Sequence, residues 1–301
     1  MDQGGLLIDG PGNTNGATTA GAQPQDGGNI DVLCMACAGP DCDFKPVQMQ
    51  RRPVGPHDVL IKMKFCGVCH SDLHFAAGHI PNYAMPASYE PGCVPGHELA
   101  GLVEAVGSEV TTVSVGMQVG VGCLVDSCRT CFKCRNGEEQ MCIRQAVGTY
   151  GSKVDTTPSQ RNKQGRSATP CGYTLGGYTD KMVVDEHFAI RIPDGYPLEA
   201  AGPVMCAGIT MYDPLVKLNA SAGTRVGIAG LGGLGQLGIK IAKAMGCTVT
   251  VISRSEAKRT HAISCGADAY IASSSVDDLV AAAGSLDIIL NTIPCYHDYG
   301  Q

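Results

Sequence analysis

The chain has 301 residues, of which 44% are hydrophobic and 17% charged, and it lacks an apolar run near the ~20 residues that cross a bilayer, so a disordered chain and a helical membrane protein are both excluded. Its 22 basic and 28 acidic residues give a formal net charge of −6. Residues 1–44 carry six of the acids and no lysine or arginine, so the remaining chain is neutral, which disfavours binding to nucleic acid or to an anionic membrane.

The 16 cysteines indicate a reducing compartment rather than a secreted disulfide scaffold. A secretory signal peptide has a basic segment followed by an apolar one, whereas this N-terminus is acidic and rich in glycine. We therefore expect a cytoplasmic protein. In such a compartment, clustered cysteines are more often metal ligands or catalytic groups than disulfides.

Residues 1–31 are predicted to be a flexible extension, because they are rich in Gly, Asn, Thr and Ala and contain little to bury. Residues 32–195 contain short β-branched runs broken by Gly, Pro and Asp, which indicates a β-rich, barrel-like domain with functional loops. The clearest of these runs are Val59–Met63, Leu102–Val106 and Met182–Val184.

Residues 196–301 predict strands and helices in alternation. Four apolar runs are expected to be strands: Arg225–Ala229, Thr248–Ile252, Ala269–Ile271 and Asp287–Leu290. After the first, apolar residues repeat with a helical period from Leu234 to Met245, and Gly246 suits the position that follows a helix. Two more helices are expected to begin near Ser255 and Ser275. Right-handed crossovers would make the four strands parallel in a doubly wound sheet.

The strongest motif is Cys128-x2-Cys131-x2-Cys134-x7-Cys142. Four thiolates so close in the chain can close a tetrahedral zinc site without a ligand from elsewhere in the fold. Such a site leaves no open coordination position, so we predict a structural zinc that stabilises the loop carrying it. The alternative, two disulfides or redox-active thiols, is disfavoured by the compartment and by the compact spacing.

A second constellation combines Cys69-His70-Ser71-Asp72-Leu73-His74 with Gly96-His97-Glu98. A catalytic zinc takes three protein ligands and leaves one position open, and Cys69 and His97 offer one soft and one borderline donor. No second histidine follows His97 at the spacing of a metalloprotease helix. Each residue alone would more often be packed or solvated, so the hypothesis of a catalytic site depends on their occurring together.

The run Gly230-Leu231-Gly232-Gly233-Leu234-Gly235 follows a predicted strand and opens a predicted helix, which indicates a dinucleotide-binding loop. The next strand ends at Ser253-Arg254-Ser255, where an NAD-binding protein usually carries an acid that bonds the ribose 2′-OH. Small hydroxyls together with Arg254 and Lys258 would instead suit the 2′-phosphate of NADP. The alternative for these residues is an ordinary polar helix start.

These motifs resemble those of the zinc-dependent alcohol dehydrogenases of the medium-chain dehydrogenase/reductase superfamily, and most closely the cinnamyl alcohol dehydrogenase group. The stretch GHELAGLVEAVGSEV, Gly96–Val110, is similar to that family's zinc signature, and Gly176–Leu215 is similar to its segment leading into the cofactor domain. The resemblance extends from about residue 45 to 300. It implies an α/β plus β protein: a GroES-like β-barrel catalytic domain followed by a Rossmann doubly wound parallel sheet.

By this resemblance Cys69, His97 and Cys206 would bind the catalytic zinc, and spacing alone could not have selected Cys206. Glu98 would lie beside the metal as a neighbouring or transient ligand, and Asp72 would orient a ligand histidine. Together with the four-cysteine site, this arrangement implies two Zn²⁺ per chain.

The resemblance also implies a proton relay and a cofactor contact. Ser71 would accept the alcohol proton and pass it through the cofactor ribose toward His74, and His70 would lie near the cofactor pyrophosphate. Zinc would lower the alcohol's pKa, and hydride would pass to the nicotinamide of NADP⁺, the reverse reaction reducing an aldehyde. The implied activity is the interconversion of primary alcohols and aldehydes with NADP(H). The alternatives are NAD as cofactor, or a catalytically silent, truncated zinc-binding or interaction protein.

Three features depart from the family. The loop Phe75–Val94 is longer than usual, and Cys34, Cys37 and Cys42 have no counterpart and are expected not to bind metal. Family members continue past the fourth strand, so the Rossmann domain is expected to be truncated at Gln301, without the strand through which the family forms homodimers. The other cysteines are expected to pack as small apolar residues: Cys66, Cys93, Cys123, Cys171, Cys247, Cys265 and Cys295.

Overall fold

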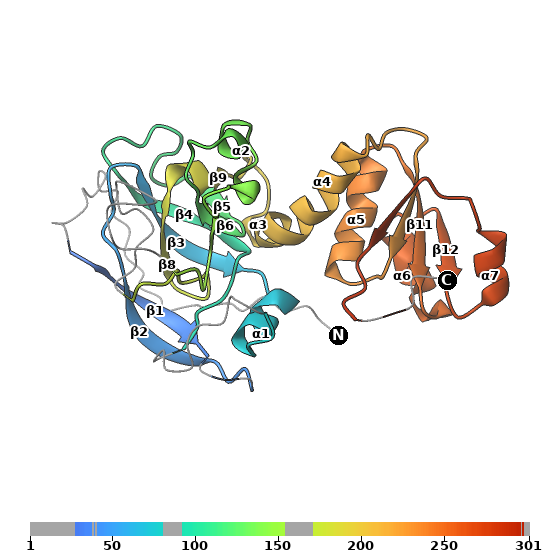
Figure 1. Ribbon diagram of the computed structural model, residues 1–301, viewed down its shortest axis with the longest axis horizontal. Coiled ribbons are helices and arrows are strands. Elements are labelled where there is room, and N and C mark those ends of the chain that lie inside the picture. The colour runs from blue at the N-terminus through green and yellow to red at the C-terminus, as the bar shows by residue number, and fades with distance from the viewer. Residues whose placement is uncertain are drawn as a thin grey trace. The chain divides into compact units, whose positions relative to one another are not determined.

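The computed structural model describes residues 28–37, 39, 41–80, 92–153, 171–295 and 297 (Figure 1). The predicted extension up to residue 27, most of the 75–94 loop, and the residues after 297 lie outside the described part. The chain forms two compact units, one ending at Cys206 and one beginning at Ala207. This division falls later than residue 195, because α3 (Leu198–Pro203) packs against strands of the first unit. None of the described helices is long and apolar enough to cross a membrane.

The first unit is built on a five-stranded antiparallel sheet in the order β8-β3-β4-β5-β9. Its strands are β3 (Asp58–Cys66), β4 (Leu99–Val106), β5 (Gln118–Val121), β8 (Lys181–Asp185) and β9 (Ile190–Arg191). Two smaller antiparallel sheets pair β1 (Ile30–Ala36) with β2 (Lys45–Arg51), and β6 (Leu124–Asp126) with β7 (Val147–Gly148). The three strands predicted for this region are therefore confirmed as β3, β4 and β8.

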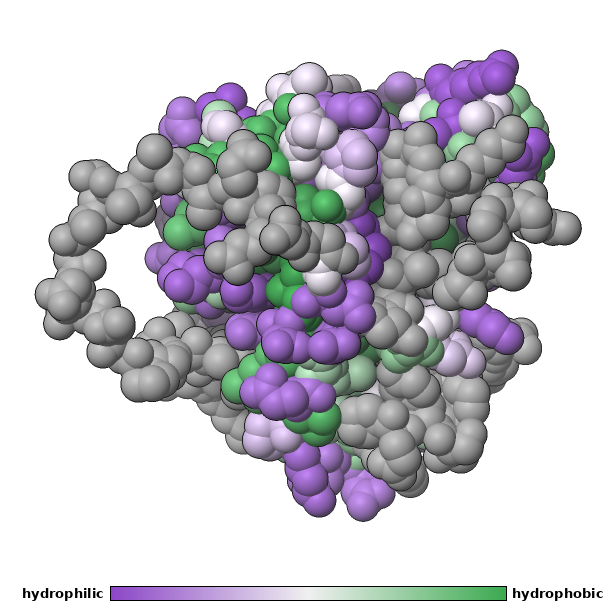
Figure 2. Space-filling model, turned by 90° about the vertical axis from the view of Figure 1, so that its left-hand side faces the viewer, coloured by the Kyte–Doolittle hydropathy of each residue, from purple (hydrophilic) through white to green (hydrophobic). Residues whose placement is uncertain are grey.

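Both faces of the first half of β3 are covered, because successive side chains of a strand point to opposite faces and the first four are all buried. Val59 and Ile61 belong to the main core cluster of the unit, whereas Leu60 between them belongs to a separate cluster. Burying each such side chain stabilises the fold by about 1.5–3 kcal/mol. Figure 2 views the first unit and shows hydrophilic and hydrophobic residues interspersed over its described surface.

The pairing of β3 with β4 fixes where the chemistry-bearing segments lie. Cys66, the last residue of β3, is paired with Leu99, the first residue of β4. The segment that follows β3 and the segment that precedes β4 therefore meet at the same end of the sheet. This arrangement brings Cys69 and His97 together although 28 positions separate them in sequence.

Short helices fill the connections of the first unit. They are α1 (His70–Ala76), α2 (Phe132–Arg135) and α3, the 3₁₀ turns η1 (Glu139–Met141) and η2 (Glu186–Phe188), and the π-helix η3 (Val204–Gly208). A buried arginine, Arg51 at the end of β2, donates hydrogen bonds to the backbone carbonyls of Leu175, Gly176 and Lys181. These bonds compensate the guanidinium for its loss of water and tie β2 to the chain around β8.

The second unit is a parallel sheet in the order β12-β11-β10-β13. Its strands are β10 (Arg225–Ala229), β11 (Thr248–Ser253), β12 (Ala269–Ala272) and β13 (Ile288–Asn291). Its helices are α4 (Ile209–Lys217), α5 (Gly233–Ala244), α6 (Arg259–Ser264) and α7 (Val276–Ala281), with the 3₁₀ turn η4 (Glu256–Lys258). Figure 1 shows α5 and α7 on opposite sides of this sheet. The predicted parallel, doubly wound arrangement is confirmed.

Strand order reverses at β10, because β11 and β12 follow on one side of it and β13 is added on the other side. In open parallel sheets a ligand crevice forms beyond the carboxyl ends of the strands where the order reverses. The glycine run that follows Ala229, the last residue of β10, begins at this point. Gly246 has a φ of 84° after α5, which confirms its predicted place beyond the helix end.

Candidate metal centres and nucleotide loop

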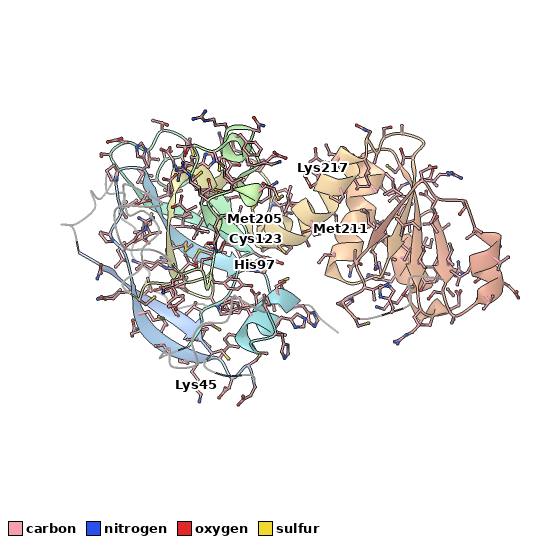
Figure 3. All side chains as sticks on the ribbon, viewed as in Figure 1. Lys45, His97, Cys123, Met205, Met211 and Lys217 are labelled. Carbon is pink, nitrogen blue, oxygen red and sulfur yellow. The ribbon has the colours of Figure 1, made fainter. Side chains whose placement is uncertain are left out.

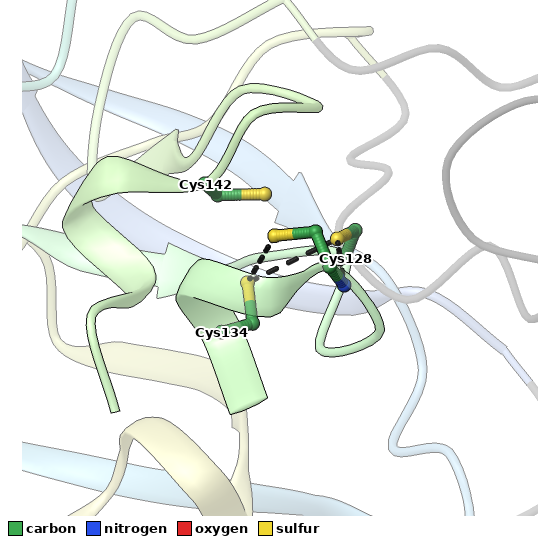
Figure 4. A group of neighbouring side chains, drawn as sticks. Cys128, Cys134 and Cys142 are labelled. Carbon is green, nitrogen blue, oxygen red and sulfur yellow. Dashed lines mark hydrogen bonds between the residues drawn. The ribbon is translucent and has the colours of Figure 1, made fainter. Parts of the chain in front are cut away.

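The four predicted cysteines converge in the loop after β6 (Figure 4). The Sγ atom of Cys134 lies 3.4 Å from Sγ of Cys131 and 3.9 Å from Sγ of Cys128. The ligand atoms of these three and of Cys142 all lie within 4.8 Å of one another. An S–S bond is about 2.0 Å long, whereas two thiolates bound tetrahedrally to zinc at 2.3 Å lie about 3.8 Å apart. The spacing therefore fits one metal ion and excludes disulfides among the four.

Local backbone structure builds this cluster. Cys131 is the N-cap of α2, and Cys134 lies within that helix. The backbone N–H of Cys131 points at Sγ of Cys128, 3.4 Å away. Burial opposes ionisation of Cys128, but the backbone N–H groups of Thr130 and Cys131 favour its thiolate and lower its pKa to about 6. A loop that already favours a thiolate is suited to a cation.

The second donor group contains Cys69, His97, Glu98 and Cys206, whose ligand atoms also lie within 4.8 Å of one another. Nε2 of His97 is 3.2 Å from Sγ of Cys206. His97 and Glu98 precede β4, and Cys206 lies in the π-helix η3. A Cβ atom at Gly67 would overlap the Glu98 carboxylate, so the glycine makes room for this acid. The structure thus brings Cys206 to the two donors that the sequence motifs contain.

Asp72 holds two members of this group in place through hydrogen bonds. It is fully buried and occupies position N3 of α1, where its carboxylate accepts the backbone N–H of Cys69, the N-cap, at 3.0 Å. The same carboxylate accepts three further hydrogen bonds, each 3.1 Å long. Their donors are Nδ1 of His97, the backbone N–H of Gly96 and the Tyr178 hydroxyl. Burial opposes ionisation of Asp72, but the bonds from His97 and the backbone outweigh it, so its pKa lies below the ordinary value. One carboxylate therefore fixes two of the donors.

The pKa values of the group suit a metal ion. The hydrogen bond with the Cys206 thiol is the main cause that lowers the pKa of Cys69 to about 3. Burial lowers the pKa of the His97 ring, but its bonds to Asp72 and Cys69 raise it more, to about 10. Burial and the charge of Cys69 raise the pKa of Glu98 to about 7. The group thus holds a thiolate facing an imidazole proton that a cation can replace.

Three residues near this group were not identified by the sequence motifs. Tyr178 donates to Asp72, and the ring of Tyr150 lies 5.6 Å from the His97 ring. Cys123 was expected to pack as a small apolar residue, which is wrong: it is exposed, and a hydrogen bond with Cys206 lowers its pKa to about 7. Figure 3 labels Cys123 and His97 in this region. Of these three residues only Tyr178 lies in a segment that carried the family resemblance, Gly176–Leu215.

The residues predicted for a proton relay lie on α1. Ser71 is partly buried and its side chain hydrogen-bonds Cys69. His70 and His74 are exposed, with ring centroids 5.9 Å apart. Among the described contacts none joins Ser71 to His74, and the nearest nitrogen partner of His74 is instead Nδ1 of His79 at 3.3 Å.

The glycine run has two kinds of position. A Cβ at Gly235 would overlap the carbonyl oxygen of Gly230, so this glycine lets α5 start close to the strand. A Cβ at Gly232 or Gly233 would meet nothing within 4 Å. Protein packing does not explain these two glycines, and their backbone amides at the start of α5 are open to a ligand. This arrangement fits a pyrophosphate. Leu234 is partly buried in the core of the unit.

The residues predicted to select NADP lie at the end of β11. Ser253 is partly buried, and Arg254 and Ser255 are exposed. Nζ of Lys258 lies 3.2 Å from the carbonyl oxygen of Leu231 in the glycine run, so Lys258 stands at the nucleotide loop. The neighbouring Arg259 is held by Glu256 through two hydrogen bonds, 2.5 and 2.8 Å long. Arg254 and Lys258 thus both lie in the segment that follows β11, and Lys258 also contacts the glycine run.

Two family models match the chain. The alcohol dehydrogenase GroES-like domain matches residues 55–194, and the zinc-binding dehydrogenase domain matches residues 233–297. NADP-dependent alcohol dehydrogenase C 1 of Mycolicibacterium smegmatis is 48% identical over 253 residues, which cover 83% of this chain and 66% of the relative. The chain thus spans about two thirds of the length of such curated relatives.

Solved structures show the same fold. A cinnamyl alcohol dehydrogenase from Sorghum bicolor superposes with a TM-score of 0.78 at 39% identity, over 89% of this chain and 71% of that one. A cinnamyl alcohol dehydrogenase from Helicobacter pylori, complexed with NADP(H), superposes with a TM-score of 0.75 at 35% identity and the same coverage of each chain. The predicted combination of a GroES-like domain with a parallel nucleotide-binding sheet is confirmed.

Proposed function

The chain belongs to the zinc-dependent alcohol dehydrogenases of the medium-chain dehydrogenase/reductase superfamily and is similar to their cinnamyl alcohol dehydrogenase group, and from this we propose that it interconverts primary alcohols and aldehydes by hydride transfer with NADP(H). The observation that carries the proposal is the convergence of Cys69, His97, Glu98 and Cys206 within 4.8 Å. A relative named as NADP-dependent and a related structure complexed with NADP(H) support this cofactor. Neither alternative, NAD or a silent interaction protein, is favoured by a described residue.

Cys69, His97 and Cys206 would hold the catalytic zinc, because two thiolates and an imidazole are donors that zinc prefers, and one position would stay open for substrate. Bound there, zinc would supply Lewis-acid polarisation of the substrate oxygen, and NADP(H) would accept or donate the hydride. Glu98 would be a further donor beside these three. The four thiolates of the separate cysteine cluster would close around a second, structural zinc.

Asp72 would act on the reaction through His97. Its carboxylate accepts a hydrogen bond from Nδ1–H of His97, and Nε2 of the ring is then the atom that faces Cys206. Ser71 would accept the hydroxyl proton of the alcohol, and His74, exposed on the same helix, would pass it to solvent. His70, exposed at the start of the helix, would contact the cofactor pyrophosphate.

The nucleotide would lie on the second unit. The amides at Gly232, Gly233 and Leu234 would bind the pyrophosphate at the start of α5, since no side chain occupies that space around the two glycines. Ser253, Ser255 and the cations Arg254 and Lys258 would bind the 2′-phosphate of NADP(H). Formation of a homodimer stays a prediction.

The proposal is tested with purified full chain, metal analysis and aldehyde-dependent NADPH oxidation. We expect about two zinc ions per chain and turnover of an aromatic or aliphatic aldehyde. Cys69→Ser should retain the structural zinc and lose turnover. Cys66→Ser is the matched control, because Cys66 is a neighbouring thiol outside the donor group. One zinc per chain with no turnover on any aldehyde would refute the proposal.

A further inference from the structure

Two exposed histidines, His74 and His79, meet at the end of α1, outside both donor groups. Their Nδ1 atoms are 3.3 Å apart, and their ring centroids are 5.5 Å apart at an interplanar angle of 53°. Nothing in the proposed reaction uses His79. The pair therefore needs a separate account.

The backbone of the helix end builds this contact. α1 ends with Ala77 as its C-cap, and Gly78 follows with a φ of 71°. The backbone N–H of Gly78 donates to the carbonyl of Phe75 at 3.0 Å, and that of His79 donates to the carbonyl of His74 at 2.8 Å. These two bonds define a Schellman motif, which brings the side chain two positions past the cap onto the third-last helical side chain. Here both side chains are imidazoles, so the fold itself sets their approach.

The separation of the two nitrogens fits a shared metal ion. Two imidazole nitrogens bound tetrahedrally to zinc at 2.0–2.1 Å lie about 3.3–3.4 Å apart. The observed Nδ1–Nδ1 distance is 3.3 Å. With metal, each neutral ring would carry its proton on Nε2 and offer Nδ1 as a donor.

A third imidazole, His70, lies on the same helix, but among the described residues only the two cysteine-containing groups bring three or more ligand atoms within 4.8 Å of one another. His70 precedes His74 by four residues, and residues at this spacing share a helix face. Their ring centroids are 5.9 Å apart. His74 and His79 are both exposed, so water can complete the coordination of an ion held by these two rings. Imidazole donors suit zinc, copper and nickel rather than magnesium or calcium.

We propose that His74 and His79 form a two-imidazole surface site for a divalent transition-metal ion such as Zn²⁺, with water as the remaining ligands, and that its occupation inhibits the enzyme. The inhibition would arise because the metal engages the His74 imidazole that otherwise passes the substrate proton to solvent. This second part rests on the proposed function, whereas metal binding does not. The site is chemically distinct from the two cysteine-containing groups, because it offers nitrogen donors only.

Metal binding is tested by equilibrium dialysis of the two-zinc protein against increasing Zn²⁺, without cofactor or substrate. The wild type should take up a third zinc. His79→Gln should bind it at least tenfold more weakly. His187→Gln is the matched control, because His187 is also an exposed histidine but faces Glu139 rather than another imidazole. A third zinc that binds equally well to His79→Gln, or no third zinc at all, would overturn the site.

Inhibition is tested by aldehyde-dependent NADPH oxidation with added Zn²⁺. Wild type and His187→Gln should be inhibited, with activity restored by a weak chelator. His79→Gln should keep the basal rate and need at least tenfold more Zn²⁺ for the same inhibition. If His79→Gln loses the third zinc yet is inhibited like the wild type, the link to His74 is wrong. A chain without any aldehyde turnover would refute the proposed function, and the dialysis result would still decide the metal site.

Discussion

Oδ1 of Asp72 lies 3.1 Å from Nδ1 of His97, although Asp72 belongs to α1 and His97 to the segment before β4. The contact orients the His97 ring, because it leaves Nε2 facing the thiol of Cys206. Partners of this kind are typically worth 10–100-fold in metal affinity. The zinc that we assign to Cys69, His97 and Cys206 should therefore depend on a residue that does not touch it.

Asp72→Asn should accordingly weaken the catalytic zinc about 10–100-fold and leave the four-cysteine zinc in place. Dialysis against a competing chelator, followed by metal analysis, should show a fall from two zinc ions per chain toward one. Asp194→Asn serves as control, because that side chain is 92% exposed and pairs only with Arg191 among the described ion pairs. Two retained zinc ions with unchanged affinity would show that Asp72 does not support the site.

Cys142→Ser should remove the structural zinc and destabilise the first unit by about 3 kcal/mol or more, because the loop loses the ion that joins its thiolates. Limited proteolysis should then cut within residues 128–142, and the catalytic zinc should remain. Cys295, like Cys123, was wrongly expected to pack as a small apolar residue, since it is exposed. Cys295→Ser, outside both donor groups, should change neither property. A melting temperature for Cys142→Ser equal to that of the wild type would contradict a structural role.

Two glycines of the nucleotide loop should respond oppositely to alanine. Gly235→Ala should destabilise the second unit by about 1–3 kcal/mol, because its Cβ would overlap the Gly230 carbonyl. Gly232→Ala should leave the melting temperature unchanged or slightly higher, since the backbone there is extended and the space around it is open. The same Gly232→Ala substitution should raise the Kd for NADPH at least about tenfold, or 1.4 kcal/mol. Wild-type NADPH affinity in Gly232→Ala would refute a pyrophosphate at this point.

Ser253→Asp should shift the cofactor preference from NADPH toward NADH. A carboxylate at the end of β11 would repel the 2′-phosphate and accept the ribose hydroxyls of NADH. The ratio of kcat/KM for NADH to that for NADPH should rise at least about tenfold. Ser114→Asp adds the same charge at an exposed position of the first unit and should leave the ratio unchanged. If Ser253→Asp leaves the ratio unchanged as well, the 2′-phosphate does not lie at this strand end.

What the sequence could predict depended on how local the determinant is. The four-cysteine site could be predicted because all its donors come from one loop between Cys128 and Cys142. The parallel sheet could be predicted because each apolar run and each helical period is continuous in the chain, from Arg225 to Asn291. Neither feature needs information about distant residues.

The donor group of Cys69, His97, Glu98 and Cys206 could be predicted only in part, because its members are distant in sequence. Cys206 lies 109 positions from His97 and carries no motif of its own, so only family resemblance could select it. Tyr178 reaches Asp72 over 106 positions through the packing of the first unit. Cys123 was assigned by its residue type alone, and the fold instead places it beside Cys206.

The central claim, hydride transfer between NADP(H) and a substrate held at Cys69, His97 and Cys206, is tested most directly by isotope transfer. The two-zinc protein is incubated with an aldehyde and NADPH that is dideuterated at C4 of the nicotinamide. The mass of the product alcohol is then measured by mass spectrometry. We expect one deuterium on the carbinol carbon of the alcohol, and no alcohol with Cys69→Ser. An alcohol without deuterium, or no alcohol from protein that holds both zinc ions and binds NADPH, would contradict it.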